Sequence, residues 1–253
     1  MHRELSHTHI VRLVAHFHDT QADYVLLALC NNDTLRHMVR RRGSLHEPEA
    51  RYLLRQTLSA LDYLRRKGIV HRDVKLGNLM LHRMQIKLGD FGLACRVADA
   101  EYGPCGTPNY LAPELILNER ATPAVDVWSA GVVLFFLLTG AAPFADEDVP
   151  STYGRIVTVD YAFPSNPIVS LEGKRFVETL LAPSPGLRPS AEQAFAHPWF
   201  AQWTPATLPR DALRTDWLAP VDNEQAPVAL CEPSPSLPLN AGTQSAEPST
   251  EPA

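Results

Sequence analysis

Apolar and polar positions alternate with two different periods along the first part of the chain. Residues 10–18 (IVRLVAHFH) and 24–29 (YVLLAL) are short apolar runs separated by the polar turn DTQAD, and they predict two strands. From Asn31 the pattern becomes helical, and residues 47–68 place leucines at helical spacing up to Gly68, which suits a helix end. We therefore expect a small β-hairpin followed by a mainly helical region.

The helical pattern continues beyond the middle of the chain. Residues 126–140 are apolar nearly all round and predict a buried helix, whose run VWSAGVVLFFLL is too short to span a bilayer. Three further helices are expected, over 151–158, 171–182 and 190–197. Ser190 and Gln193 have the spacing of a capping box for the last of them. Residues 69–92 instead alternate short apolar runs with loops.

The composition changes after Trp203. Residues 204–253 contain nine prolines and a single aromatic residue, Trp217, which is too little apolar surface for a core. This segment holds seven acids and two arginines, whereas residues 1–203 carry 21 acids and 21 bases, so the segment accounts for the net charge of −5. We predict a partial domain over 1–203 and a disordered, proline-rich acidic tail over 204–253.

Several classes of function are not favoured. Nothing in the sequence argues for nucleic-acid binding, which would need a basic face. The run Arg40–Arg42 is most simply a solvated helix end, with phosphate or nucleic-acid contact as the minor alternative. The four cysteines show no paired spacing, and the four histidines within residues 7–18 lack the closed ligand set that zinc needs. Residues 1–24 form no signal-peptide core. We expect an intracellular protein, cytoplasmic or nuclear, that binds neither membranes nor nucleic acids.

The chemical signal is an ordered set of short motifs. The set comprises His71-Arg72-Asp73, Lys75, Asn78, Asp90-Phe91-Gly92, Gly106-Thr107-Pro108 and Ala112-Pro113-Glu114, followed by Asp126 and Arg188. Each motif alone is weak evidence, but the order and spacing of the complete set match the protein-kinase signature. An acceptor carboxylate, a cation and hard oxygen ligands for magnesium are the residue types that phosphoryl transfer needs.

The segments HRDVKLGN, KLGDFGLA, CGTPNYLAPE and EPEARYLLRQ together resemble the polo-like kinase family, over the region from about residue 2 to about residue 208. The resemblance implies an α+β, protein-kinase-like fold, with a remnant β-hairpin of the small lobe over 1–30 and a mainly helical large lobe over 31–203. It also implies ATP and Mg²⁺ as cofactors and protein substrates or scaffold partners. Lys75 and Thr107 are the types that serine/threonine kinases carry.

The resemblance implies roles in catalysis and cofactor binding for four of the matched residues. Asp73 would accept or orient the proton of the substrate hydroxyl, and Lys75 would offer a charge to the transferring phosphoryl oxygens. Asn78 and Asp90 would hold Mg²⁺ through oxygen atoms and so bind the nucleotide.

Other matched residues would have structural roles. Phe91 would pack under the small lobe, and Gly92 would permit the turn that follows it. Glu114 and Arg188 would form an ion pair that fastens the segment after the activation loop. Asp126 would accept backbone N–H bonds from the catalytic loop.

The small-lobe part of the chain departs from the family pattern. The first glycine is Gly43 and the first lysine is Lys67, so no glycine-rich loop and no strand lysine precede the catalytic loop. Leu29 and Cys30 fall where a hinge would receive adenine, so one wall of that pocket is expected. We expect little or no catalysis by these 253 residues.

The activation segment departs as well. Before Cys105 it reads LACRVADAEYGP, without serine or threonine. Gly103 stands where the family places its activating phosphothreonine, so Arg72 would lack the phosphate that it normally pairs with. Only Glu101 and Tyr102 are nearby in the sequence.

Three readings follow from these departures. The chain is a catalytically impaired polo-like kinase, a pseudokinase that acts as a scaffold or binding module, or a fragment of a complete active kinase. The final 50 residues are too few and too polar for the polo boxes that most of the family carries. A centrosomal location would rest on analogy alone.

Overall fold

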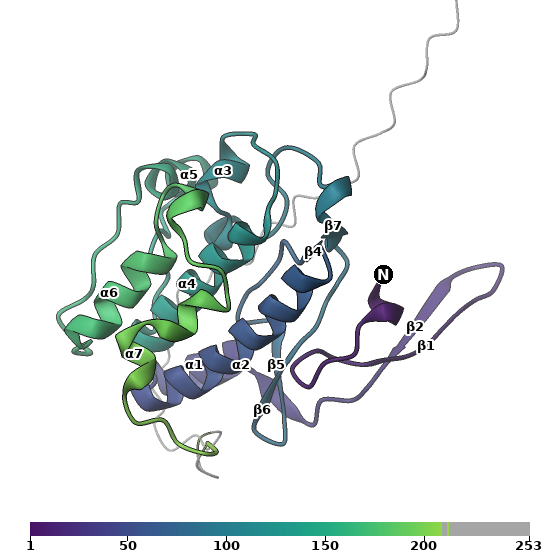
Figure 1. Cartoon of the computed structure of the whole chain (residues 1–253), viewed down its shortest axis with the longest axis horizontal. Helices are drawn as coiled ribbons and strands as arrows, with labels where there is room; N and C mark the ends of the chain where they lie inside the picture. The colour runs from purple at the N-terminus through teal and green to yellow at the C-terminus, as the bar shows by residue number, and fades with distance from the viewer. Residues whose placement is uncertain (209–211, 213–253) are drawn as a thin grey trace, which may run out of the picture.

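The computed structural model describes residues 1–208 and 212, and shows a helical body from which a β-hairpin projects (Figure 1). The predictions for 209–211 and 213–253, and with them most of the acidic tail, lie outside the described residues. At the start of the tail segment, Leu208 and Ala212 are buried. The mixture of α-helices and small β-sheets predicted from the sequence is confirmed.

Seven α-helices occur within the described residues. They are α1 (Leu35–Arg42), α2 (Glu47–Arg66), α3 (Pro113–Ile116), α4 (Pro123–Thr139), α5 (Val149–Thr158), α6 (Leu171–Leu180) and α7 (Pro198–Ala201). The apolar α4 is buried on nearly all sides between α2 and α6. Thr122 caps its N-terminus with a side chain that accepts a hydrogen bond from the Ala124 N–H, and Gly140, in the left-handed conformation, caps its C-terminus.

The helix expected over 190–197 does not form. Ser190 and Gln193 make the reciprocal hydrogen bonds of the predicted capping box, at 2.9 and 3.1 Å. Only a 3₁₀ turn follows, however, from Gln193 to Ala196. Pro198 accounts for the end of this turn at Ala196, because a proline pushes the residue before it out of the helical region, and His197 has an extended backbone.

Three small antiparallel sheets accompany the helices in the part of the chain that the structure describes. The hairpin pairs β1 (Leu13–His18) with β2 (Asp23–Leu27), a second sheet has the order β3 (Asn32–Thr34), β5 (Leu79–His82), β6 (Gln85–Leu88), and a third pairs β4 (Ile69–Val70) with β7 (Cys95–Arg96). The prediction that the helical pattern starts at Asn31 was wrong, because β3 precedes α1. The first strand also starts later than residue 10, because Ile10 instead forms a parallel bridge with Leu88.

Residues 1–12 and the hairpin differ in burial. Leu5, Ile10 and Val11 are buried in the main core, and the Val11 N–H donates to the Leu88 carbonyl at 2.9 Å. Residues 14 and 16–27, by contrast, are exposed, including large apolar side chains. The core therefore extends to residue 11, and the hairpin extends away from it (Figure 1).

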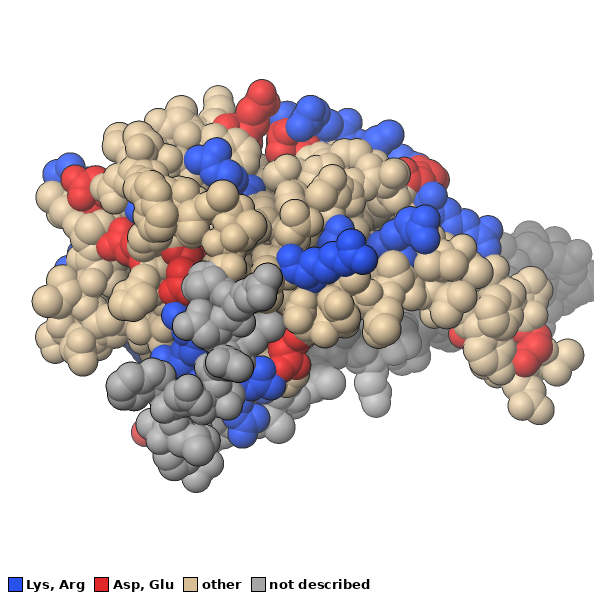
Figure 2. All heavy atoms as spheres, turned by 90° about the horizontal axis from the view of Figure 1, so that it is seen from below, with Lys and Arg blue, Asp and Glu red and all other residues tan. Residues whose placement is uncertain are grey.

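Basic side chains on the face shown in Figure 2 are interspersed with acidic and neutral ones. In the run Arg40–Arg42, Arg41 pairs with Asp33, and Arg42 makes two bonds to Glu49 at 2.7 and 2.8 Å. These contacts are those of a helix end with local acidic partners. None of the helices in the described part of the chain is both long enough and apolar enough to cross a bilayer.

Candidate active site

The loop at residues 71–78 connects β4 to β5 and is fixed by a buried carboxylate from α4. Asp126 accepts hydrogen bonds from the backbone N–H groups of His71, at 2.8 Å, and Arg72, at 2.9 Å. Burial raises the pKa of Asp126 to about 6, although the two N–H donors act in the opposite direction. The carboxylate thus ties the start of the loop to the most buried helix.

His71 joins this loop to the segment that contains Asp90. The Asp73 N–H donates to His71 Nδ1 at 3.3 Å, so the imidazole proton lies on Nε2, which donates to the Gly89 carbonyl at 3.0 Å. Burial lowers the pKa of His71 to about 4, and the ring is therefore neutral near pH 7. The Gly89 N–H in turn donates to the Asn78 carbonyl at 2.9 Å. These bonds place Asp90 beside the loop.

The Asp73 carboxylate is held by three neighbours. Its Oδ2 contacts Lys75 Nζ at 2.6 Å and accepts from Asn78 Nδ2 at 2.9 Å. Its Oδ1 accepts from the Thr107 hydroxyl at 2.7 Å and from the Thr107 N–H at 3.2 Å. Lys75 also donates to the Thr107 hydroxyl at 2.8 Å. The sequence identified Thr107 only as a residue that is typical of serine/threonine kinases. It did not predict that Thr107 contacts Asp73.

Asn78 and Asp90 supply oxygen atoms suited to magnesium. The Asn78 amide nitrogen is committed to the Asp73 carbonyl and carboxylate, which leaves the amide oxygen as the coordinating atom. Asp90 is exposed with φ +59°, and its Oδ1 accepts from the Gly92 N–H at 3.4 Å. Mg²⁺ is held by few protein oxygens and keeps several waters, so these residues fit it. No cluster of three or more His, Cys, Asp or Glu side chains within the described residues could hold a metal.

Phe91 is packed between two histidine rings. Its ring centroid lies 4.5 Å from that of His2 and 4.8 Å from that of His71. His2 is itself fixed by a 2.8 Å hydrogen bond between its Nε2 and the Val11 carbonyl. The N-terminal segment therefore covers Phe91. No sequence signal had pointed to His2.

Glu114 and Arg188 form a buried bidentate ion pair. Arg188 Nη1 and Nη2 donate to the two Glu114 carboxylate oxygens at 2.6 and 2.8 Å. The guanidinium also donates to the Ala182 and Pro183 carbonyls and lies over the Trp128 ring, 4.9 Å from its centroid. Its donors are thus matched by several acceptors, as a buried charge requires.

Arg72 and Gly106 bring the activation segment against the loop. Arg72 Nε donates to the Leu93 carbonyl at 2.7 Å. Gly106 has φ +125°, and a Cβ atom at this position would lie 2.4 Å from the Arg72 carbonyl oxygen. Only glycine permits this approach, which sets Thr107 beside Asp73.

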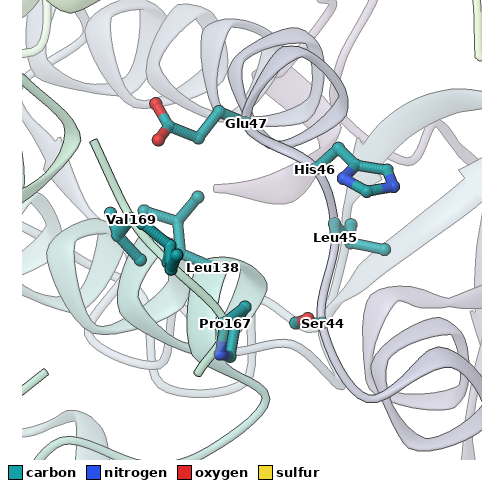
Figure 3. Close-up of a pocket in the computed structure, with 8 residues that line it drawn as sticks. Ser44, Leu45, His46, Glu47, Leu138, Pro167 and Val169 are labelled. Carbon is teal, nitrogen blue, oxygen red and sulfur yellow. The ribbon is translucent and has the colours of Figure 1, made fainter. Parts of the chain in front are cut away.

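The expected hinge residues are the least enclosed part of the site. Leu29 is 83% exposed, whereas Cys30 is partly buried, and burial raises the pKa of its thiol. A cavity of about 120 Å³ lies between the loop before α2 and residues 167–169 (Figure 3). None of the predicted site residues lines this cavity.

Comparisons with known proteins show which family the chain is similar to. Residues 1–200 match the protein kinase domain family. The chain is 42% identical over 219 residues to the Dictyostelium discoideum protein named "Probable serine/threonine-protein kinase PLK". The aligned region covers 85% of the chain and 22% of that relative. It is 38% identical to the Saccharomyces cerevisiae "Cell cycle serine/threonine-protein kinase CDC5/MSD2", over 83% of the chain and 30% of the relative. It is 37% identical to the Mus musculus "Serine/threonine-protein kinase PLK2", over 85% of the chain and 32% of the relative.

The chain thus spans between 22% and 32% of the length of these three relatives. Within that span lie the motifs on which the predicted resemblance rested, and the resemblance is confirmed. The chain belongs to the protein kinase family, in its polo-like serine/threonine branch.

Proposed function

We propose that the site serves transfer of the γ-phosphoryl group of ATP to serine or threonine hydroxyls of protein substrates. The observation that carries this proposal is the Asp73 carboxylate, which is oriented by Lys75, Asn78 and Thr107 through contacts of 2.6 to 3.2 Å. An oriented carboxylate beside a cation is suited to holding a hydroxyl for attack on a phosphoryl group.

Each residue has a defined part in this proposal. Asp73 orients the acceptor hydroxyl and accepts its proton, and Lys75, 2.6 Å away, offsets negative charge on the transferred oxygens. Asn78 and Asp90 would hold Mg²⁺. ATP would supply the phosphoryl group, and Mg²⁺ would neutralise the negative charge of its phosphates. Thr107 fixes Asp73 and, because it belongs to the segment after the activation loop, lies where a substrate peptide would approach.

We also propose that the polypeptide of these 253 residues binds ATP–Mg²⁺ weakly. Most of the described hairpin is exposed, and Leu29 at the expected adenine wall is 83% exposed. No lysine precedes Lys67 in the sequence, so the hairpin brings no ammonium group toward the phosphates. Positioning and charge neutralisation are the main sources of catalysis in this reaction, and both would be reduced.

Two measurements on the purified 253-residue chain test these proposals. With radioactive ATP–Mg²⁺ and a serine/threonine-rich protein acceptor, we expect at most slow labelling, which is abolished in Asp73→Asn. Labelling that persists in Asp73→Asn would contradict the assigned site. At millimolar ATP–Mg²⁺ we expect a negligible shift in the thermal unfolding midpoint. A saturable shift that disappears in Asp90→Asn would contradict the weak-binding proposal while supporting the site.

A second candidate is a binding module that recruits a protein partner without catalysis. The exposed apolar side chains of the hairpin favour it, because a contiguous apolar surface commonly marks an interaction site. The stacked pair Phe17–Tyr24, with centroids 5.1 Å apart, stands beside Leu26 on this hairpin. A function that is retained in Asp73→Asn but lost in Phe17→Ser would favour this candidate over transfer chemistry.

A further inference from the structure

The activation segment contacts the loop that follows α3. Arg120, in that loop, donates from Nε to the Ala100 carbonyl at 3.1 Å and from Nη2 to the Ala98 carbonyl. Ala98 lies in the 3₁₀ turn Val97–Asp99, and Ala100 is buried. One guanidinium therefore binds two carbonyls that are two residues apart. Both bonds have a charged donor, which makes them stronger than bonds between neutral groups.

The backbone reinforces this contact one step further along the segment. Tyr102 and Arg120 form an antiparallel bridge. Gly103 follows with φ +97°, and a Cβ atom there would lie 3.0 Å from Asn118 Oδ1. A threonine at position 103 would be both strained and crowded in this conformation. The position where the family carries its phosphothreonine is thus shaped for glycine.

The other arginines near the segment also have partners in the chain. Arg72 Nε donates to the Leu93 carbonyl at 2.7 Å, and Arg96 Nη2 pairs with Glu4 at 2.8 Å. Residues 93–104 contain no serine or threonine that could carry a phosphate. The contacts that order the segment therefore come from cations and backbone groups already present in the chain.

We propose that Arg120 is a positioning residue that holds the activation segment in place without phosphorylation. By fixing residues 98–102, it sets the path that leads through Gly106 to Thr107, which contacts Asp73. The regulatory meaning of this role rests on the proposed kinase function. Its structural content does not, and the experiment below measures order in the segment and not catalysis.

The test is amide hydrogen exchange on the full 253-residue chain, followed by peptide over residues 95–105. In Arg120→Ala we expect these amides to exchange at least about tenfold faster, because two charge-assisted bonds are lost. Peptides from α2 and α4 should be unchanged. Arg120→Lys should recover part of the protection, because a lysine can bind one of the carbonyls but lacks the planar fork. The matched control is Arg155→Ala, which removes a guanidinium bond to the Ala145 carbonyl elsewhere.

Three outcomes would overturn the proposal. The first is unchanged exchange over 95–105 in Arg120→Ala. The second is equally faster exchange throughout the domain, which would show that Arg120 stabilises the whole domain and not the activation segment in particular. If Arg120→Ala fails to fold, Arg120→Lys is the variant to compare with the wild type. The third is faster exchange over 95–105 after phosphatase treatment of wild-type chain purified from eukaryotic cells, with intact mass recording any phosphate removed. That result would show that a phosphate orders the segment.

Discussion

The loop at residues 71–78 and the hairpin at residues 13–27 represent opposite ways of ordering a chain. In the loop, His71 and Arg72 are bound by Asp126, more than 50 residues away, and Asp73 is bound by Thr107, 34 residues away. In the hairpin, the strand pairing joins β1 and β2 to each other, and most of the side chains are exposed. The floor of the site is therefore fixed by the helical core, whereas the geometry of the hairpin is fixed mainly by its own two strands, which are marginal alone.

The largest expected effect is on the buried ion pair of the large lobe. Arg188→Ala would leave the Glu114 carboxylate buried without its partner, and we expect the free energy of unfolding to fall by about 3–5 kcal/mol. Chemical denaturation monitored by tryptophan fluorescence measures the change.

The control for this prediction is Arg155→Ala. Arg155 forms an ion pair with Asp160, and their side chains are 31% and 70% exposed, respectively. Exposed pairs contribute at most about 1 kcal/mol. If the two variants lose similar amounts of stability, the prediction is contradicted, because the buried ion pair would then contribute no more to stability than the exposed one.

The next effect concerns pH and the catalytic loop. Burial lowers the pKa of His71 from its ordinary value of 6.5 to about 4. Between these values the unfolded chain binds the proton and the folded chain does not, so this residue's contribution to stability is lost as pH falls from 6.5 toward 4. The difference in free energy of unfolding between the wild type and His71→Gln should therefore shrink by about 3 kcal/mol over that window. Denaturation curves at several pH values measure it.

Asp126 acts with the opposite sign and provides the control. Burial raises its pKa from 3.8 to about 6, so its contribution is present at low pH and is lost as pH rises through 6. Asp126→Asn removes this opposing contribution, and the increase in stability with pH should become steeper in that variant. A pH dependence that is unchanged in both variants would show that neither side chain is buried as described.

Much of the fold was accessible from the sequence because the period of apolar residues reports burial directly. The helix predicted over 126–140 is α4, and that over 47–68 is α2, with ends that differ by up to three residues. The spacing of the kinase motifs likewise gave the residues that the structure gathers around Asp73. Motif spacing carries this information because the chemistry requires particular side chains at particular distances.

The sequence could not give the contacts that depend on local conformation or long-range packing. The capping residues Ser190 and Gln193 were identified, yet only a 3₁₀ turn follows them, and it ends one residue before the extended His197 that precedes Pro198. His2, which packs against Phe91, and Arg120, which binds two backbone carbonyls, belong to no sequence motif. The first contact joins rings about 90 residues apart in the chain, and the second uses backbone carbonyls, which every residue has, so no local pattern marks either in advance.

The smallest expected effect lies in the hairpin itself. Phe17 is 55% exposed and stacks on Tyr24, so Phe17→Ser should lower the free energy of unfolding of the large lobe by about 0.5 kcal/mol or less. Phe176→Ala, which empties a fully buried site in α6, should cost about 3–5 kcal/mol in the same assay.

Amide exchange compares the same two regions directly. Residues 14–27 should exchange rapidly, whereas the Val11 amide, bonded to Leu88, should be protected because it belongs to the core. A large loss of stability in Phe17→Ser, or slow exchange along β2, would mean that the hairpin packs on the lobe and that both regions fold as one unit.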